Sequence, residues 1–112
     1  MGKIVVITDS TAYIPSPLIL KHGIRVVPLS LIWGSEVFRD GVDMMPAEFY
    51  ARLKTAKVMP STSQPSPDEF KKVFRPIVEA GNAVLAVLLS SQLSGTVDSA
   101  VQAKQAFPNA TI

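Results

Sequence analysis

The stretch Lys-Ile-Val-Val-Ile-Thr-Asp-Ser-Thr, residues 3–11, decides the fold class of this protein. Its four consecutive β-branched residues, 4–7, favour a strand, because branched side chains pack well on a pleated surface. An apolar run without alternation is typical of a strand that is buried on both faces of a parallel sheet. Asp9, Ser10 and Thr11 follow this run, so we expect them at the carboxyl end of the strand.

Other segments of strand length lie farther along the chain. Residues 24–29, which are apolar except for Arg25, and the apolar run 83–89 are predicted strands. Pro28 favours an edge position for the first of them because proline cannot donate to a sheet ladder. Residues 31–39 carry two apolar stretches on either side of a Gly-Ser pair, which predicts a hairpin. Residues 110–112 resemble the opening of one more strand.

Helix signals separate these strands. Ser66 and Glu69 have the spacing of a capping box, in which each side chain accepts a hydrogen bond from the other residue's backbone N–H. Ser16 is likewise predicted to cap a short helix, and two more helices are expected, one that starts at Pro46 and one that ends near Phe107. Strands that alternate with helices predict an α/β fold, a mostly parallel sheet with helices on both faces.

Apolar residues at helical spacing mark the faces that these helices are expected to bury. The expected buried residues are Phe49, Tyr50 and Leu53 after Pro46, Phe70, Val73, Phe74, Ile77 and Val78 after Ser66, and Val97, Ala100 and Val101 in the last helix.

The composition argues against several classes of protein. The 112 residues include no cysteine, which removes disulfides, thiolate metal sites and cysteine nucleophiles together. The net charge is only +2, and lysine and arginine are scattered, so a nucleic-acid partner is not expected. The longest apolar run, residues 83–89, is too short to cross a bilayer, and the run 4–7 is too short for a signal peptide. We therefore expect a cytoplasmic protein with no stable membrane insertion.

Three hydroxyl-rich segments are expected at or near the carboxyl edge of the sheet, where ligands of open α/β folds bind. They are residues 9–11, 61–64 and 90–96. Two of them lead into helix N-termini, where free backbone N–H groups and the helix dipole attract anions. The segments therefore indicate an anion site, suited to a carboxylate or a phosphate. The competing interpretation is that these serines and threonines are ordinary helix caps.

No catalytic or metal site is predicted. His22 is the only histidine, and it lies beside Gly23 near a helix C-terminus, where a cation pairs with the helix dipole. Asp9 has no second carboxylate at metal-ligand spacing, and Asp40 and Asp43 are expected to be loop acids.

The three hydroxyl-rich blocks together resemble the DegV family. The resemblance rests on Asp9-Ser10-Thr11 after a strand, on Pro-Ser-Thr-Ser-Gln-Pro-Ser at 60–66 and on Ser-Ser-Gln-Leu-Ser-Gly-Thr at 90–96, in that order. Asp-Gly-Val-Asp at 40–43 is similar to the acidic loop of that family. The resemblance runs across essentially the whole chain, although Ser61 stands where many relatives have threonine.

The resemblance implies a protein that binds a long-chain fatty acid and needs no cofactor. Some family members are binding subunits of bacterial fatty acid kinases, which present the acid to a separate kinase protein. Carried over by motif, Thr62 and Ser94 would hydrogen-bond the fatty-acid carboxylate. The neighbouring residues expected around the pocket are Asp9, Ser10, Thr11, Ser61, Ser63, Ser91 and Gly95.

Family members are substantially longer than 112 residues. The resemblance therefore implies that residues 1–112 form an N-terminal α/β domain, and that a second domain, absent from this chain, helps to enclose the acyl tail. Two rival hypotheses remain at this point. One is a phosphate- or nucleotide-binding α/β enzyme that uses the same serine- and threonine-rich loops; the other is a folding unit whose hydroxyls only cap helices.

Overall fold

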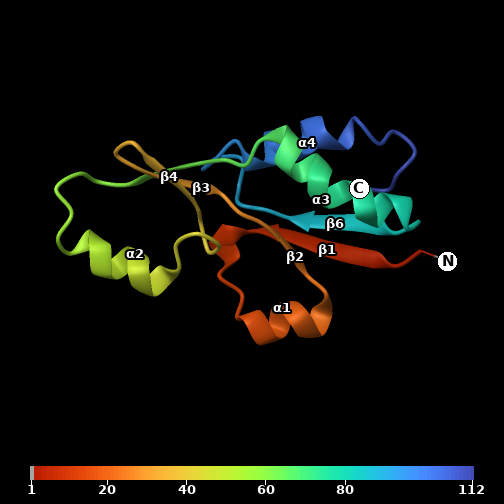
Figure 1. The fold of residues 1–112 in the computed structure, drawn as a ribbon. Coiled ribbons are helices and arrows are strands. Elements are labelled where there is room, and N and C mark those ends of the chain that lie inside the picture. The colour runs from red at the N-terminus through yellow and green to blue at the C-terminus, as the bar shows by residue number, and fades with distance from the viewer. Residues whose placement is uncertain (1) are drawn as a thin grey trace.

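A parallel sheet of three strands forms the centre of the computed structural model, which describes residues 2–112 (Figure 1). The strands are β1 (Ile4–Asp9), β2 (Arg25–Val27) and β6 (Ala83–Val87), in the order β2-β1-β6. Both neighbours of β1 run parallel to it. The predicted parallel arrangement and the edge position of β2 are therefore confirmed.

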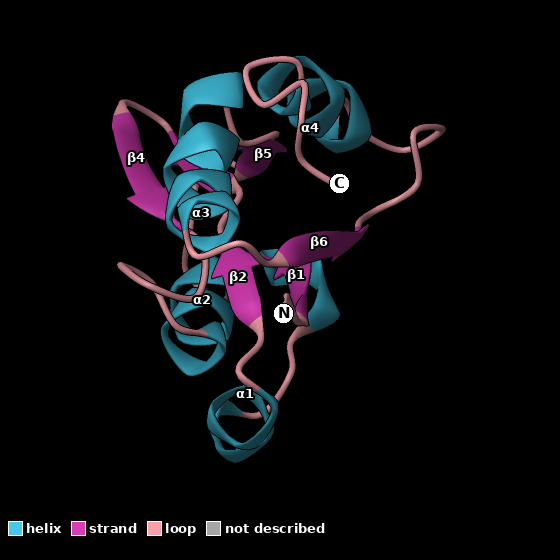
Figure 2. Ribbon diagram, turned by 90° about the vertical axis from the view of Figure 1, so that its right-hand side faces the viewer, coloured by secondary structure: helices cyan, strands magenta, loops and turns pink. Residues whose placement is uncertain are grey.

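Helices lie on both faces of this sheet, as predicted. Figure 2 shows α1 (Ser16–His22) on one side, with α3 (Pro67–Glu79) and α4 (Thr96–Lys104) on the other. No helix within residues 2–112 combines the length and the apolar character needed to cross a membrane.

The capping box of α3 is present in full. The Ser66 hydroxyl accepts a hydrogen bond from the Glu69 backbone N–H at 3.2 Å, and the Glu69 carboxylate accepts one from the Ser66 N–H at 3.1 Å. The apolar face of α3 is buried at Phe70, Phe74 and Ile77. It forms the main core with buried residues of the parallel sheet and α4, which are Ile7, Val27, Val84, Ala100 and Ala103.

A second, antiparallel sheet extends from the first. The predicted hairpin forms β3 (Ser30–Trp33) and β4 (Glu36–Arg39), and α2 (Pro46–Leu53) follows it. Leu31, Trp33 and Met44 make a small separate core, against which Phe49 and Leu53 of α2 pack. The expectation that Tyr50 shares this buried face was wrong: Tyr50 lies off the stripe of Phe49 and Leu53 and is exposed.

Three local predictions were wrong. The N-cap of α1 is Pro15, and Ser16 is already helical and makes no capping hydrogen bond. Residues 61–63, where no strand was predicted, form β5 (Ser61–Ser63), which pairs antiparallel with β3. Residues 110–112 are not a strand, although the Thr111 carbonyl accepts a hydrogen bond from the Val84 N–H at 2.9 Å, beside β6.

The predicted burial was also wrong in places. The face of the parallel sheet that carries α1 is only partly covered, because Ile4, Leu85 and Val87 are exposed. In α4, Ala100 is buried as predicted and Ala103 is buried too, whereas Val101 is half exposed. Apolar runs indicate strands correctly here, but they do not tell which face is covered.

Replacement of Ser66 by alanine removes the hydroxyl that accepts the hydrogen bond from the Glu69 backbone N–H. We therefore expect Ser66→Ala to lower the free energy of unfolding by about 1 kcal/mol. The matched control is Ser16→Ala, because the Ser16 side chain caps nothing. Urea denaturation of both variants measures the difference. Equal destabilisation by the two substitutions would contradict this account of the two helix starts.

Candidate functional site at the carboxyl edge of the parallel sheet

The carboxyl ends of β1 and β6 bring the first and third hydroxyl-rich segments together. Thr8 is paired with Val87 across the two strands, so Asp9 lies beside the residues that follow β6. The Asp9 carboxylate accepts a hydrogen bond from the Leu89 backbone N–H at 2.6 Å. This contact links residues 9–11 directly to the start of the loop 90–96.

Asp9 is held as a structural anion. Its side chain is 1% exposed and accepts hydrogen bonds from the Thr11 backbone N–H at 2.9 Å and from the Thr11 hydroxyl, in addition to that of Leu89. A buried carboxylate needs such donors, because an unpaired charge is costly away from water. Both carboxylate oxygens are occupied, so Asp9 organises the edge and is not oriented to grip a ligand.

The hydroxyls next to Asp9 also fix the backbone. Ser10 accepts a hydrogen bond from the Leu29 N–H at 3.0 Å, and Thr8 donates to the Val87 carbonyl at 2.8 Å. Together with the Thr11 contact to Asp9, these bonds engage every side-chain hydroxyl of residues 8–11. These hydroxyls therefore have structural partners, while Asp9 and Ser10 also line the cavity of about 320 Å³ beyond the end of β1.

Thr62 lies in β5, where its backbone is paired opposite Leu31 of β3. Side chains alternate along a strand, so Ser61 and Ser63 point to the face opposite to that of Thr62. The Thr62 residue is exposed and lines a small cavity of about 70 Å³. The structure thus separates Thr62 from the two serines that flank it, although all three were predicted around one pocket.

Ser94 lies at the N-terminal end of α4. Its hydroxyl accepts a hydrogen bond from the Thr96 N–H at 3.3 Å and lies 2.9 Å from the Thr96 hydroxyl, which is itself fully buried. When the Thr96 hydroxyl donates in this pair, the Ser94 oxygen accepts twice and its own proton remains free for a ligand. Ser91, in contrast, lies in an exposed turn.

Gly95 brings the second and third segments together. A Cβ atom at this position would lie 2.9 Å from the Gln64 side-chain nitrogen, closer than ordinary packing allows. Gly95 therefore permits the start of α4 to approach the end of the block that contains Thr62. The three segments that were predicted to meet at one edge are thus connected through Asp9 with Leu89 and through Gly95 with Gln64.

Two neighbouring cavities open at this edge. The larger, of about 320 Å³, lies beyond the end of β1 and extends between α1 and the loop before α2. The smaller is the 70 Å³ cavity that Thr62 lines. Tyr13, Asp40 and Pro46 line both cavities. The lining of the larger cavity includes apolar residues from several elements, namely Ala12, Ile14, Ile19, Val26, Val42 and Met45.

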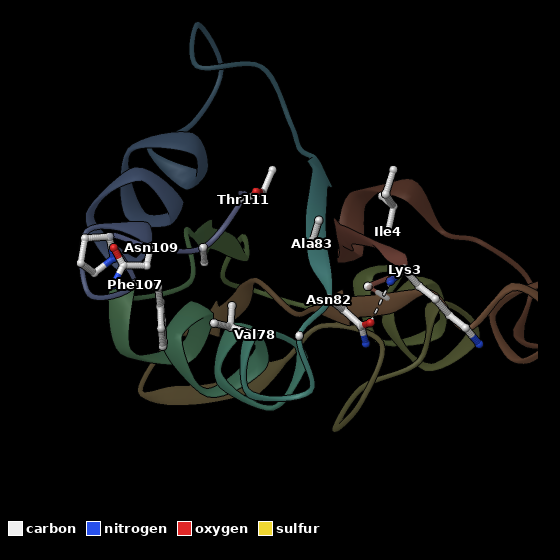
Figure 3. Close-up of a pocket in the computed structure, with 12 residues that line it drawn as sticks. Lys3, Ile4, Val78, Asn82, Ala83, Phe107, Asn109 and Thr111 are labelled. Carbon is white, nitrogen blue, oxygen red and sulfur yellow. Dashed lines mark hydrogen bonds between the residues drawn. The ribbon is translucent and has the colours of Figure 1, made fainter.

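A cavity of about 550 Å³ lies at the opposite, amino-terminal edge of the sheet (Figure 3). Lys3, Asn82 and Thr111 are among the residues that line it, and the Lys3 backbone N–H donates to the Asn82 side chain at 2.9 Å. None of the hydroxyl-rich segments contributes to its lining. The cavity at the carboxyl edge, where the hydroxyl-rich segments meet, is therefore smaller than the one at the amino-terminal edge.

Tyr13 was missed by sequence reasoning. It follows the short 3-10 helix η1 (Ser10–Ala12), and its φ of 47° is the only positive value at a non-glycine position within residues 2–112. Its hydroxyl lies 3.5 Å from the Asp40 carboxylate, and burial, with the charge of Asp40 as a second cause, raises the pKa of the Tyr13 phenol. No sequence pattern identifies a tyrosine in the left-handed region, so the sequence did not indicate that Tyr13 lines these cavities.

The acidic loop at 40–43 is held from within. Arg39 forms two side-chain hydrogen bonds to Asp43, at 3.1 and 3.2 Å, and the hydrogen bonding from Arg39 lowers the pKa of the Asp43 carboxyl. Asp43 is therefore a loop acid, as predicted, whereas Asp40 faces both cavities.

The comparison with known proteins identifies the family. A family model described as "Uncharacterised protein, DegV family" matches residues 3–112. The chain belongs to the DegV family. A DegV domain-containing protein of Caldanaerobacter subterraneus is 44% identical over 104 residues, which are 93% of this chain and 37% of that protein. Protein DegV of Bacillus subtilis is 35% identical over 107 residues, or 96% of this chain and 38% of that protein.

Solved structures of DegV proteins share this fold. A DegV family protein from Thermus thermophilus, described by its fatty acid binding, has a TM-score of 0.87 at 38% identity and matches 98% of this chain and 39% of its own. A stearic acid-binding protein from Eubacterium ventriosum has a TM-score of 0.86 at 34% identity and matches 100% of this chain and 40% of its own. The chain therefore spans less than half the length of the relatives that it matches.

Replacement of Asp9 by asparagine puts an amide where a carboxylate now accepts three hydrogen bonds. We expect Asp9→Asn to lower the free energy of unfolding by about 2 kcal/mol, because the amide nitrogen then faces backbone or hydroxyl donors. Asp40→Asn is the matched control, with an expected change below about 0.5 kcal/mol because Asp40 makes only one long side-chain contact. Urea denaturation distinguishes the two, and a smaller effect at Asp9 than at Asp40 would overturn the role given to Asp9.

Proposed function

We propose that this DegV family protein binds a long-chain fatty acid, with the carboxylate at the hydroxyl-lined carboxyl edge of the parallel sheet. The observation that carries the proposal is the fold shared with the DegV protein of Thermus thermophilus, which is described by its fatty acid binding. The mixed lining of the 320 Å³ cavity supports it, because apolar residues surround a few polar groups there.

We assign the carboxylate to Thr62 and Ser94. Thr62 lines a cavity, and the Ser94 hydroxyl has a proton available to a ligand when the Thr96 hydroxyl donates to it. The N-terminus of α4, directly after Ser94, adds backbone N–H groups and the positive end of a helix dipole. Neutral donors of this kind orient a carboxylate and offset the cost of removing it from water.

The acyl tail supplies most of the affinity in this proposal. Each buried methylene contributes about 0.8 kcal/mol, so a chain of about sixteen carbons contributes on the order of 10 kcal/mol before ordering costs. The two cavities of about 320 and 70 Å³ are small for a tail of that length. We therefore propose that residues 1–112 are the N-terminal domain of a longer protein, and that its second domain encloses the rest of the tail.

We propose a carrier role without catalysis by these residues. The protein would hold the acid and present it to a separate fatty acid kinase, a partner that the family resemblance suggests. The cytoplasmic location expected from the sequence stays a prediction. The relatives described above give no support to the alternative, a phosphate- or nucleotide-binding enzyme.

The test is mass spectrometry of lipid extracted under denaturing conditions from the purified full-length protein. We expect a long-chain fatty acid in the wild type and a loss of loading of about tenfold or more in the double variant Thr62→Val and Ser94→Ala, because two hydrogen bonds to a charged group are removed. Valine keeps the shape of Thr62 and suits a strand.

Ser61→Ala is the matched control, since Ser61 is adjacent to Thr62 but points to the opposite face of β5. It is expected to keep wild-type loading. Full loading of the double variant would refute the head-group assignment, and an empty wild-type protein would refute fatty acid binding itself.

A further inference from the structure

Tyr13 ends η1 in the left-handed region of the backbone. A φ of 47° is unfavourable for a residue with a Cβ atom, and here it accompanies a helix-ending hydrogen bond from the Tyr13 N–H to the Ser10 carbonyl at 3.3 Å. The residue is 63% exposed, so burial of its ring contributes little to the folded state. Non-glycine residues in the left-handed region occur at helix ends and also at ligand-binding sites.

Tyr13 lies where two cavities of the carboxyl edge share a wall. Tyr13 lines the 320 Å³ cavity beyond β1 and also the 70 Å³ cavity of Thr62, so the residue stands where the two cavities adjoin. Asp40 lies opposite, 3.5 Å from the phenol oxygen, and Pro46 at the start of α2 completes the shared wall. An acyl chain that ran from Thr62 into the larger cavity would lie beside these shared residues.

We propose that the Tyr13 ring is a specificity-determining residue, a gate between the two cavities that restricts the width of the acyl chain. This inference rests on the proposed fatty acid binding and adds the shape of the acid that the site prefers. A straight saturated chain is narrow along its whole length. A methyl branch or a cis double bond widens or bends the chain, and a rigid aromatic ring at the passage disfavours both.

The left-handed backbone makes a clean test available. Glycine adopts a φ of 47° without strain, and Tyr13→Gly therefore removes the ring without forcing the backbone to move. Tyr13→Phe keeps the ring and removes only the hydroxyl that faces Asp40. The two variants together distinguish the effect of the ring's size from the effect of its contact with Asp40.

The experiment offers the delipidated full-length protein an equimolar mixture of palmitic acid, an anteiso-branched C17 acid and oleic acid, and counts the bound species by native mass spectrometry. We expect Tyr13→Gly to raise the loading of the branched and cis-unsaturated acids relative to palmitic acid by about tenfold. One methylene that fits a pocket poorly changes selectivity by a factor of this order. Tyr13→Phe is expected to select acids as the wild type does.

Each other outcome has a distinct meaning. If wild type and Tyr13→Gly both bind acids in the same proportions, the gate is refuted while fatty acid binding stands. If Tyr13→Phe changes the proportions as much as Tyr13→Gly, the hydroxyl and not the ring governs selection, which also refutes the gate. If the wild type binds none of the three acids, the proposed function fails first.

Discussion

The buried carboxylate of Asp9 is the interaction on which the rest of the edge depends. It accepts hydrogen bonds from Leu89 and Thr11 while it is almost completely removed from water. Because a charge in that position is tolerated only with its donors in place, the end of β1 and the chain that leaves β6 must keep one relative arrangement. The same constraint positions the start of α4, because only residues 88–95 separate it from the end of β6.

This constraint divides the hydroxyl groups of the edge into two kinds. Those of Thr8, Ser10 and Thr11 make hydrogen bonds within the edge itself, so they help to build the rim. Thr62 and Ser94 keep hydrogen-bonding capacity, the former by its exposure and the latter through its pairing with Thr96. A segment rich in serine and threonine is therefore not uniformly a binding segment, and the buried members position the open ones.

Sequence reasoning succeeded where the cause is local. The β-branched run at 4–7 and the capping box of Ser66 and Glu69 depend on neighbouring residues, and both elements form as predicted. It failed where the cause is distant in the chain. The strand at 61–63 exists because β3 is available to pair with it, and the exposure of Leu85 depends on what covers that face of the sheet. The left-handed backbone of Tyr13 likewise has no local signature.

In the proposed site, hydroxyl groups orient the carboxylate and the apolar cavity holds the tail. Neutral hydroxyls orient a carboxylate without neutralising it, so the head group keeps its charge and its oxygen atoms keep their reactivity. Affinity then comes from apolar burial, which is non-directional and does not depend on the chemistry of the head group. A site of this design can hold a fatty acid firmly by its tail while it leaves the carboxylate accessible at the edge of the sheet. The proposed carrier role requires only this orientation, whereas transition-state stabilisation requires donors aimed at charge that develops during a reaction.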